Sequence, residues 1–320
     1  MLREFELIRR IYSKFRINTK TIIGIGDDCA VLKEKDKYYL YTIDSMIESV
    51  HFDVKLGVSW DDVGYKSVIR AISDVVAMGG IPKYILIALS MRKGFKEDFF
   101  QGLIKGVKNA IEEHNLKLIG GDISNSKTVS ITVSVIGISK DKPVLRSGAN
   151  IGDDIYLTGY TGLASAGLVV LKKKLNFQGF EAFVNAYKKP AVKVKLGKAL
   201  QKIATSMIDI SDGLVGDLSH LLENSNKGGI LYESNIPVHE AFYNSPFSKK
   251  QIKGFIMNGG DDYELLFTAS PEKIKDIERI SKTFSVKITK IGEIVKKGLY
   301  LKEGQHLKAL KSSSYEHVIG

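Results

Sequence analysis

The chain has 320 residues, of which 44 % are hydrophobic and 26 % are charged, as in ordinary globular proteins. No apolar run approaches the roughly 20 residues that span a bilayer, and the mixed N-terminus resembles neither a signal nor a transit peptide. The only cysteine is Cys29, which excludes an intrachain disulfide and disfavours a cysteine-based zinc site. We therefore expect a cytoplasmic protein with no membrane partner.

The formal net charge of +11 indicates an anionic partner. The lysines are scattered, and the densest run, at 172–174, has no interleaved aromatic residues. No nucleic-acid-binding motif is present, so a solvated basic surface is favoured and a nucleic-acid partner is not expected.

The first half of the chain alternates helical and strand-like patterns. Apolar spacing predicts a helix over 4–15, and a β-type run over 38–43 ends at Asp44. Ser59 and Asp62 form a capping-box pattern that opens a helix ended by the glycines at 79–80. Further elements follow in order: a strand over 84–90, a helix over 97–114, and strands over 116–119 and 129–138. This mixture predicts an α/β or α+β class.

A second unit is expected to begin near residue 150, after a turn-rich stretch. Its predicted elements are a strand over 155–159, helices over 162–173 and 191–205, and strands over 207–210, 264–268 and 285–295. No proline- or serine-rich linker separates the units, so we predict two closely packed domains, 1–147 and 148–320.

Five short segments place a carboxylate beside a turn or a strand end. They are Gly26-Asp27-Asp28, Ile43-Asp44, Ser73-Asp74, Gly120-Gly121-Asp122 and Asp209-Ile210-Ser211-Asp212-Gly213. Carboxylates that share a site repel one another unless they are neutralised. Mg²⁺ prefers hard oxygen ligands and leaves positions for phosphate oxygens, and the glycines let backbone N–H groups approach phosphate. Together the segments predict a multi-metal phosphate site.

Each acid also has a structural interpretation. Asp27 and Asp28 could form a turn, Asp212 precedes a glycine as in many turns, and Asp74 lies four residues after Arg70, as in a surface helix ion pair. The apolar neighbours of Asp44 favour a functional role, because an acid buried there without a partner is costly. No Walker-type loop, dinucleotide fingerprint or protein-kinase motif is present, so a bound nucleotide needs another architecture.

Seven segments, in order along nearly the whole chain, resemble the thiamine-monophosphate kinase family. They are GIGDDCAVL (24–32), TIDSMIESVHF (42–52), SDVVAMGGIPKY (73–84), LIGGDIS (118–124), RSGANIGDDIYLTG (146–159), IDISDGLVGDL (208–218) and GGDDYELLFT (259–268). The resemblance extends to the group of aminoimidazole ribonucleotide synthetase. It implies a two-domain synthetase-like fold: an N-terminal mixed-sheet domain that forms a homodimer, a C-terminal α/β domain, and ATP between them.

The resemblance also implies roles for individual residues. The implied magnesium ligands are Asp28, Thr42, Ile43 through its backbone, Asp44, Asp74, Asp122, Asp209 and Asp212. Of these, Asp44, Asp74 and Asp212 would carry the catalysis. The implied ATP contacts are Gly121, Arg146, Ser211 and Phe99, and the implied contacts to thiamine monophosphate are His51, Asp261 and Tyr315. Asp261 replaces the glutamate of many members, and the C-terminal motif lacks its usual tryptophan.

The implied reaction is direct, magnesium-assisted, in-line transfer of phosphate from ATP to thiamine monophosphate. The acceptor is already an anion, so positioning and charge neutralisation suffice without a general base. Two alternatives remain: another ATPase of the same superfamily acting on a different small substrate, and a non-catalytic nucleotide-binding regulator. The chain lacks the N-terminal and C-terminal cysteines that selenophosphate synthesis and the hydrogenase-maturation dehydratase would require.

Overall fold

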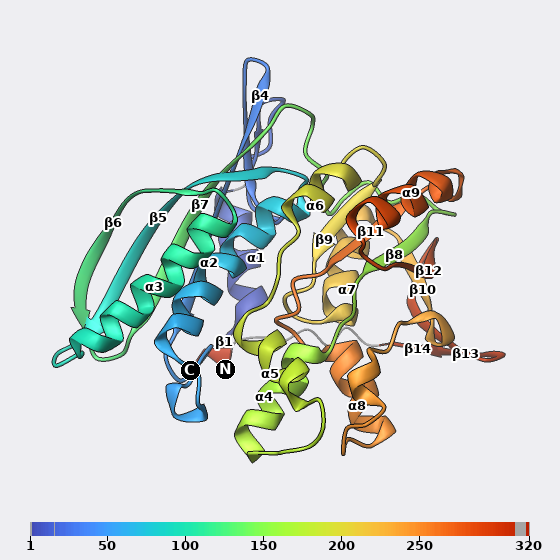
Figure 1. Cartoon of the computed structure of the whole chain (residues 1–320). Helices are drawn as coiled ribbons and strands as arrows, with labels where there is room; N and C mark the ends of the chain where they lie inside the picture. Colours follow the sequence, from blue (N-terminus) through green and yellow to red (C-terminus); the bar gives the residue numbers. More distant parts are fainter. Residues whose placement is uncertain (1, 16, 311–317, 320) are drawn as a thin grey trace.

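The computed structural model describes residues 2–15, 17–310 and 318–319. Two mixed sheets with helices packed against them dominate it, as the predicted fold class requires (Figure 1). The first sheet has the strand order β2-β3-β4-β7-β5-β6 and the second β14-β13-β10-β12-β8-β11-β9.

The first sheet is antiparallel except where β5 pairs with β6 in parallel. Its strands are β2 (Ile22–Ile23), β3 (Ala30–Glu34), β4 (Lys37–Ile47), β5 (Ile81–Arg92), β6 (Lys117–Ser126) and β7 (Ser130–Ser139). Alternate residues of β7, including Val133, are buried against helix α2 (Trp60–Ala77), so the strand reads as a half-buried one. Two predicted strands were too short: β4 runs on past Asp44, and β6 contains Gly121 and Asp122.

Helices α2 and α3 (Glu97–Glu113) cover one face of this sheet. The predicted capping box is confirmed, because Ser59 and Asp62 exchange side-chain to backbone hydrogen bonds at the start of α2. The two helices pack closely through glycines: a Cβ at Gly64 would lie 2.1 Å from the Leu103 carbonyl oxygen, and one at Gly106 would lie 1.9 Å from that of Asp61. Even alanine at either position would force the helices apart.

The second sheet contains strands β8 (Asp154–Thr158), β9 (Ser206–Asp209), β10 (Gly228–Tyr232), β11 (Leu265–Ala269), β12 (Ile288–Val295), β13 (Leu299–Glu303) and β14 (His306–Ala309). Its helices are α4 (Leu163–Lys173), α5 (Phe180–Lys188), α6 (Val194–Leu200), α7 (Leu214–Ser225), α8 (Lys249–Asn258) and α9 (Ile274–Phe284). Short 3-10 turns are η1 (Val54–Leu56), η2 (Glu233–Asn235), η3 (Glu240–Phe242) and η4 (Pro271–Lys273). The helix predicted over 191–205 was too long, since only α6 forms there.

Helix α2 lies between the two sheets, against β4 and β7 on one side and β9 on the other. One apolar core contains Ile69 of α2, Val133 of the first sheet and Phe267 of the second. The two units therefore share buried surface, as the absence of a linker predicted.

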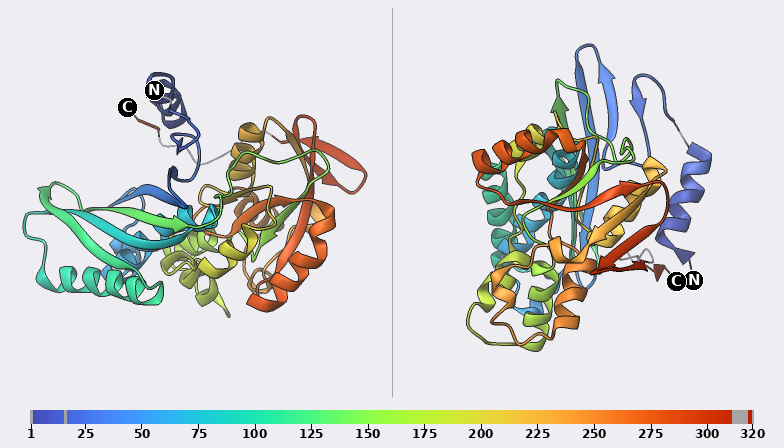
Figure 2. Two further views of the ribbon diagram at one scale, coloured as in Figure 1. Left: turned by 90° about the horizontal axis from the view of Figure 1, so that it is seen from above. Right: turned by 90° about the vertical axis from the view of Figure 1, so that its right-hand side faces the viewer.

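The N-terminal helix α1 (Glu4–Phe15) forms over the predicted residues and stands off the body of the molecule (Figure 2). It follows β1 (Leu2–Arg3), which pairs antiparallel with β15 (Val318–Ile319), so both chain ends lie side by side. Among the described residues, no helix has the length and apolar character needed to cross a membrane.

Candidate active site

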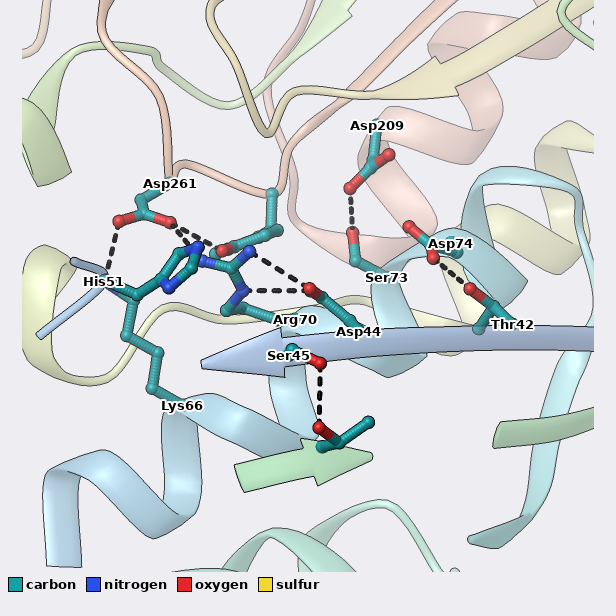
Figure 3. A network of polar contacts seen from close by, with 12 residues as sticks. Thr42, Asp44, Ser45, His51, Lys66, Arg70, Ser73, Asp74, Asp209 and Asp261 are labelled. Carbon is teal, nitrogen blue, oxygen red and sulfur yellow. Dashed lines mark hydrogen bonds and ion pairs between the residues drawn. The ribbon is translucent and has the colours of Figure 1, made fainter. Parts of the chain in front are cut away.

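Four of the predicted acids lie near the C-terminal half of α2. They are Asp28, Asp44, Asp74 and Asp209. The Thr42 hydroxyl donates to Asp74 Oδ2, and the Ser73 hydroxyl donates to Asp209 Oδ2 at 2.7 Å (Figure 3). Thr42 and Asp44 alternate along β4 and face α2, whereas Ile43 between them is 68 % exposed on the other face. Only the backbone of Ile43 could therefore serve this cluster.

Burial and mutual repulsion define the electrostatics of the cluster. Burial raises the pKa of Asp74 well above its usual range, and the charges of Asp209, Asp28 and Asp44 raise it further. Burial likewise raises the pKa of Asp209 to about 7 and that of Asp28 to about 6. Such groups carry their negative charge at neutral pH only at a cost, which a bound cation would remove.

The donor set fits magnesium. Asp28 Oδ2 is buried without a hydrogen-bond partner, and its neighbours offer further hard carboxylate oxygens. Among the described residues, no three acids, histidines or cysteines are already close enough to hold a metal by themselves. Mg²⁺ is usually held by one or two carboxylates together with water and substrate phosphates, so a complete protein cage is not needed.

Arg146 borders the cluster. Its Nε donates to Asp28 Oδ1 at 2.8 Å, and its backbone N–H donates to the Asp27 carboxylate at 3.1 and 3.2 Å. The guanidinium lowers the pKa of Asp28, although burial outweighs it. Asp27 therefore fixes the segment that carries Arg146, while Arg146 places a partly exposed positive charge beside the acids.

A second polar network lies next to Asp44 and contains two cations that the sequence analysis did not place in the site. Arg70 pairs with Asp44, and Lys66 Nζ donates to Asp261 Oδ2 at 2.9 Å (Figure 3). The surface ion pair considered between Arg70 and Asp74 was wrong, because Asp74 bonds to Thr42 instead. Although burial raises the pKa of Asp261, Lys66 and Arg70 lower it to about 2.

The loops that carry Ser211, Asp212 and Asp261 meet at this point. The Asp261 N–H donates to the Ser211 carbonyl at 2.8 Å. Buried Asp217 accepts the N–H groups of Asp212 at 3.1 Å and Gly213 at 3.0 Å, which fixes the loop at the start of α7. Burial raises the pKa of Asp212 to about 6, and the Glu4 and Asp209 charges add to this.

Gly121 and Asp122 lie apart from the four acids within one chain. Strand pairing sets Asp122 opposite Ala88, then Thr132, then Ser45, which puts it three strands from β4. That is about 14 Å, on the sheet face opposite Asp44. A Cβ at Gly121 would lie 2.0 Å from the Ile87 carbonyl oxygen, so close strand packing alone requires this glycine.

The remaining predicted residues have separate settings. Phe99 packs on Trp60 with ring centroids 5.8 Å apart, and Trp60 lies about 20 Å from Asp74 along α2. His51 belongs to the network of Figure 3, and its Nδ1 accepts the Ile47 N–H at 3.0 Å. Tyr315 falls outside the described residues.

The sequence reasoning missed three residues of the candidate site, namely Lys66, Arg70 and Asp217. Lys66 and Arg70 precede Asp74 by eight and four residues on one helix, so the helical period could have placed them on the same face. Asp217 follows Asp212-Gly213 at the start of a helix, a spacing that indicates a carboxylate receiving loop N–H groups.

Asp262 supplies a pH-dependent contribution to stability near the site. Burial raises its pKa to about 8, while the N–H groups of Gly162 and Ala164 at the start of α4 oppose the shift. The folded chain therefore holds a proton that the unfolded chain releases near its ordinary pKa. This contribution is present at low pH and is lost as the pH rises through 8.

We expect Asp262→Asn to flatten the fall in the free energy of unfolding between pH 5 and 8, by at most about 1.4 kcal/mol per pH unit. Urea unfolding across this range measures the slope, with Asp276→Asn on the exposed helix α9 as the control. Parallel curves for Asp262→Asn and the wild type would contradict the assignment.

Comparison with known proteins identifies the family of the chain. Residues 26–139 match the family described as AIR synthase related protein, N-terminal domain, and residues 150–302 match its C-terminal domain. The thiamine-monophosphate kinase of Buchnera aphidicola from Acyrthosiphon pisum is 35 % identical, with 98 % of each chain covered. That of Bacillus subtilis is 32 % identical, covering 98 % of this chain and 99 % of its own.

A solved structure described as AaThiL complexed with AMPPCP and TMP superimposes with a TM-score of 0.88 at 30 % identity. It covers 99 % of this chain and 97 % of its own. The chain belongs to the thiamine-monophosphate kinase family, within the AIR synthase related proteins.

Proposed function

We propose that this chain transfers the γ-phosphoryl group of ATP to thiamine monophosphate, with magnesium, to give thiamine diphosphate and ADP. The observation that carries the proposal is the cluster of Asp28, Asp44, Asp74 and Asp209, which has cationic side chains on two sides. The similar structure with AMPPCP and TMP supports ATP and thiamine monophosphate as the two substrates.

In this proposal the acids hold magnesium, which neutralises charge on the phosphates. The ligands are Asp28, Asp44, Asp74, Asp209 and Asp212, with the Ile43 backbone and Thr42 beside them. Ser73 orients Asp209, and Asp217 holds the loop of Asp212. Arg146 and Ser211 contact the nucleotide, whereas Phe99 packs on Trp60 at the far end of α2 and is given no role at the base. His51, Asp261 and Tyr315 form the thiamine end. Direct in-line transfer then needs orientation and charge stabilisation only.

We also propose a homodimer formed through the first sheet. Its uncovered face exposes apolar side chains on β4 and β5, namely Tyr41, Ile43, Tyr84 and Leu86. Strand β6 is an edge strand, and uncovered edges favour pairing with another chain. Asp122 lies on this same face, so we propose that it and Gly121 reach the nucleotide within the dimer.

A charged substitution on this face is expected to break the dimer. Leu86→Arg should sediment as a monomer, since a buried unpaired guanidinium is costly at an apolar interface. Ile274→Arg, at an exposed position of α9, is the matched control and should sediment as the wild type does. Equal masses for the wild type and Leu86→Arg would remove this proposal.

Substrate-dependent turnover tests the proposed reaction. We expect thiamine diphosphate and ADP in equal amounts from thiamine monophosphate and MgATP, and no product after chelation of magnesium. ADP release with another small substrate alone would favour a different ATPase of the superfamily. ATP binding without turnover would favour the non-catalytic regulator. The cytoplasmic location and the boundary between residues 147 and 148 remain parts of this proposal.

A further inference from the structure

Arg70 occupies the carboxylate of Asp44 with a two-point contact. Its Nε donates to Asp44 Oδ2 at 2.9 Å and its Nη2 donates to Asp44 Oδ1 at 3.2 Å. The Arg70 side chain is 17 % exposed, so it is largely covered but not fully buried. A proposed magnesium ligand therefore has a cationic partner that a metal ion must displace or share.

The other side of the Arg70 guanidinium faces Asp261, at the proposed thiamine end of the site. Its Nη1 lies 3.6 Å from Asp261 Oδ1. Asp261 already receives hydrogen bonds from Lys66 at 2.9 Å and from the Tyr263 hydroxyl at 2.7 Å. Lys66 is only 4 % exposed, donates to the Tyr187 carbonyl, and lies over the Tyr187 ring. Lys66 is therefore held in place by Asp261 and Tyr187. Arg70 lies between Asp44 and Asp261 and is the better candidate to bind another anion.

Magnesium binding at Asp44 would leave Arg70 in need of another anionic partner. Lys66 and Arg70 together balance Asp261 and Asp44 in the ligand-free chain. A magnesium ion on Asp44 engages that carboxylate, which leaves the Arg70 guanidinium without its main counter-charge. A guanidinium matches a phosphate through two parallel N–H···O bonds, a geometry that lysine cannot offer.

We propose that Arg70 recognises the phosphate of the acceptor, exchanging Asp44 for that phosphate when magnesium takes the carboxylate. The inference rests on the proposed function, and it makes Arg70 the residue that distinguishes a phosphorylated acceptor from the free alcohol. It also makes magnesium and the guanidinium competitors for Asp44 in the absence of phosphates.

Calorimetric titration of Arg70→Met and Arg70→Lys tests this assignment. With magnesium and AMPPCP present, Arg70→Met should bind thiamine monophosphate roughly ten- to a hundredfold more weakly, as expected for a lost charged hydrogen bond. Its affinity for thiamine should be unchanged, and Arg70→Lys should fall between. Arg279→Met, which breaks an exposed pair with Asp276, is the matched control and should bind both ligands as the wild type does.

A magnesium titration without nucleotide gives a readout that does not depend on the acceptor. Arg70→Met should bind magnesium more tightly than the wild type, because Asp44 no longer has a competing cation. Equal or weaker magnesium binding would overturn the exchange at Asp44.

The acceptor titrations distinguish a failure of the Arg70 proposal from a failure of the proposed function. Unchanged thiamine monophosphate binding by Arg70→Met, or an equal loss for thiamine, would overturn the role of Arg70 alone. A wild-type chain that binds no thiamine monophosphate would overturn the proposed function together with this inference. Matching thermal unfolding of the variants establishes that any loss of binding is local.

Discussion

Asp74→Asn is expected to lower kcat by about a thousandfold or more while raising the melting temperature of the magnesium-free chain. Removing one preorganised electrostatic group from an active site typically costs about two to three orders of magnitude in rate, and a metal ligand belongs at the upper end. Without metal, Asp74 lies half-buried near the charges of Asp209, Asp28 and Asp44. Asparagine removes that repulsion and can still accept the Thr42 hydrogen bond.

Both effects are measurable on one preparation. Steady-state kinetics with MgATP gives kcat, and calorimetric melting with and without magnesium gives the stability. Asp44→Ala should also abolish turnover with the fold retained, whereas Asp276→Asn on the surface should change neither quantity. Near-normal rates in both Asp74→Asn and Asp44→Ala would remove the metal-site interpretation.

Lys66→Met should lower the free energy of unfolding by about 3–5 kcal/mol, the usual cost of removing one partner of a buried ion pair. The Lys66 ammonium is almost fully buried and satisfies both Asp261 and the Tyr187 carbonyl. Methionine fills the space but leaves Asp261 with Arg70, 3.6 Å away, as its cation. Urea unfolding of the purified variant measures the loss.

The double variant Lys66→Met/Asp261→Asn separates charge from packing. If the weakened pairing of the Asp261 carboxylate causes the loss, the second substitution should restore part of the stability and the effects should not add. Strictly additive losses would show that Lys66 acts through packing on the Tyr187 ring instead.

The sequence predicted those parts of the fold that local patterns determine. The capping box at Ser59 and the helix over 4–15 were confirmed because hydrogen-bonding partners and apolar spacing lie within a few residues of each other. The helix over 191–205 was overextended, because the chain leaves α6 after Leu200 to reach β9. That departure is set by tertiary packing, which no short window contains.

For the site, the sequence supplied residue types and the fold supplied neighbours. Asp28, Asp44, Asp74 and Asp209 gather as a shared site would require. Asp122 also stands in a glycine-containing acidic segment, but it lies on the opposite face of the sheet. Successive side chains of a strand point to opposite faces. The pairing of Arg70 with Asp44 spans 26 residues, and nothing local in the sequence selects it over Asp74.

Helix α2 fixes a length as well as a set of side chains. Lys66, Arg70 and Asp74 are spaced four residues apart on it, so the substrate end and the metal end are about 12 Å apart along one rigid axis. The regular rise of the helix fixes the distance between the two ends. A single-residue insertion between Lys66 and Asp74 would rotate one end by about 100° relative to the other. Changes in acceptor size must therefore be accommodated by the loops at 211–212 and 260–262, because α2 cannot stretch.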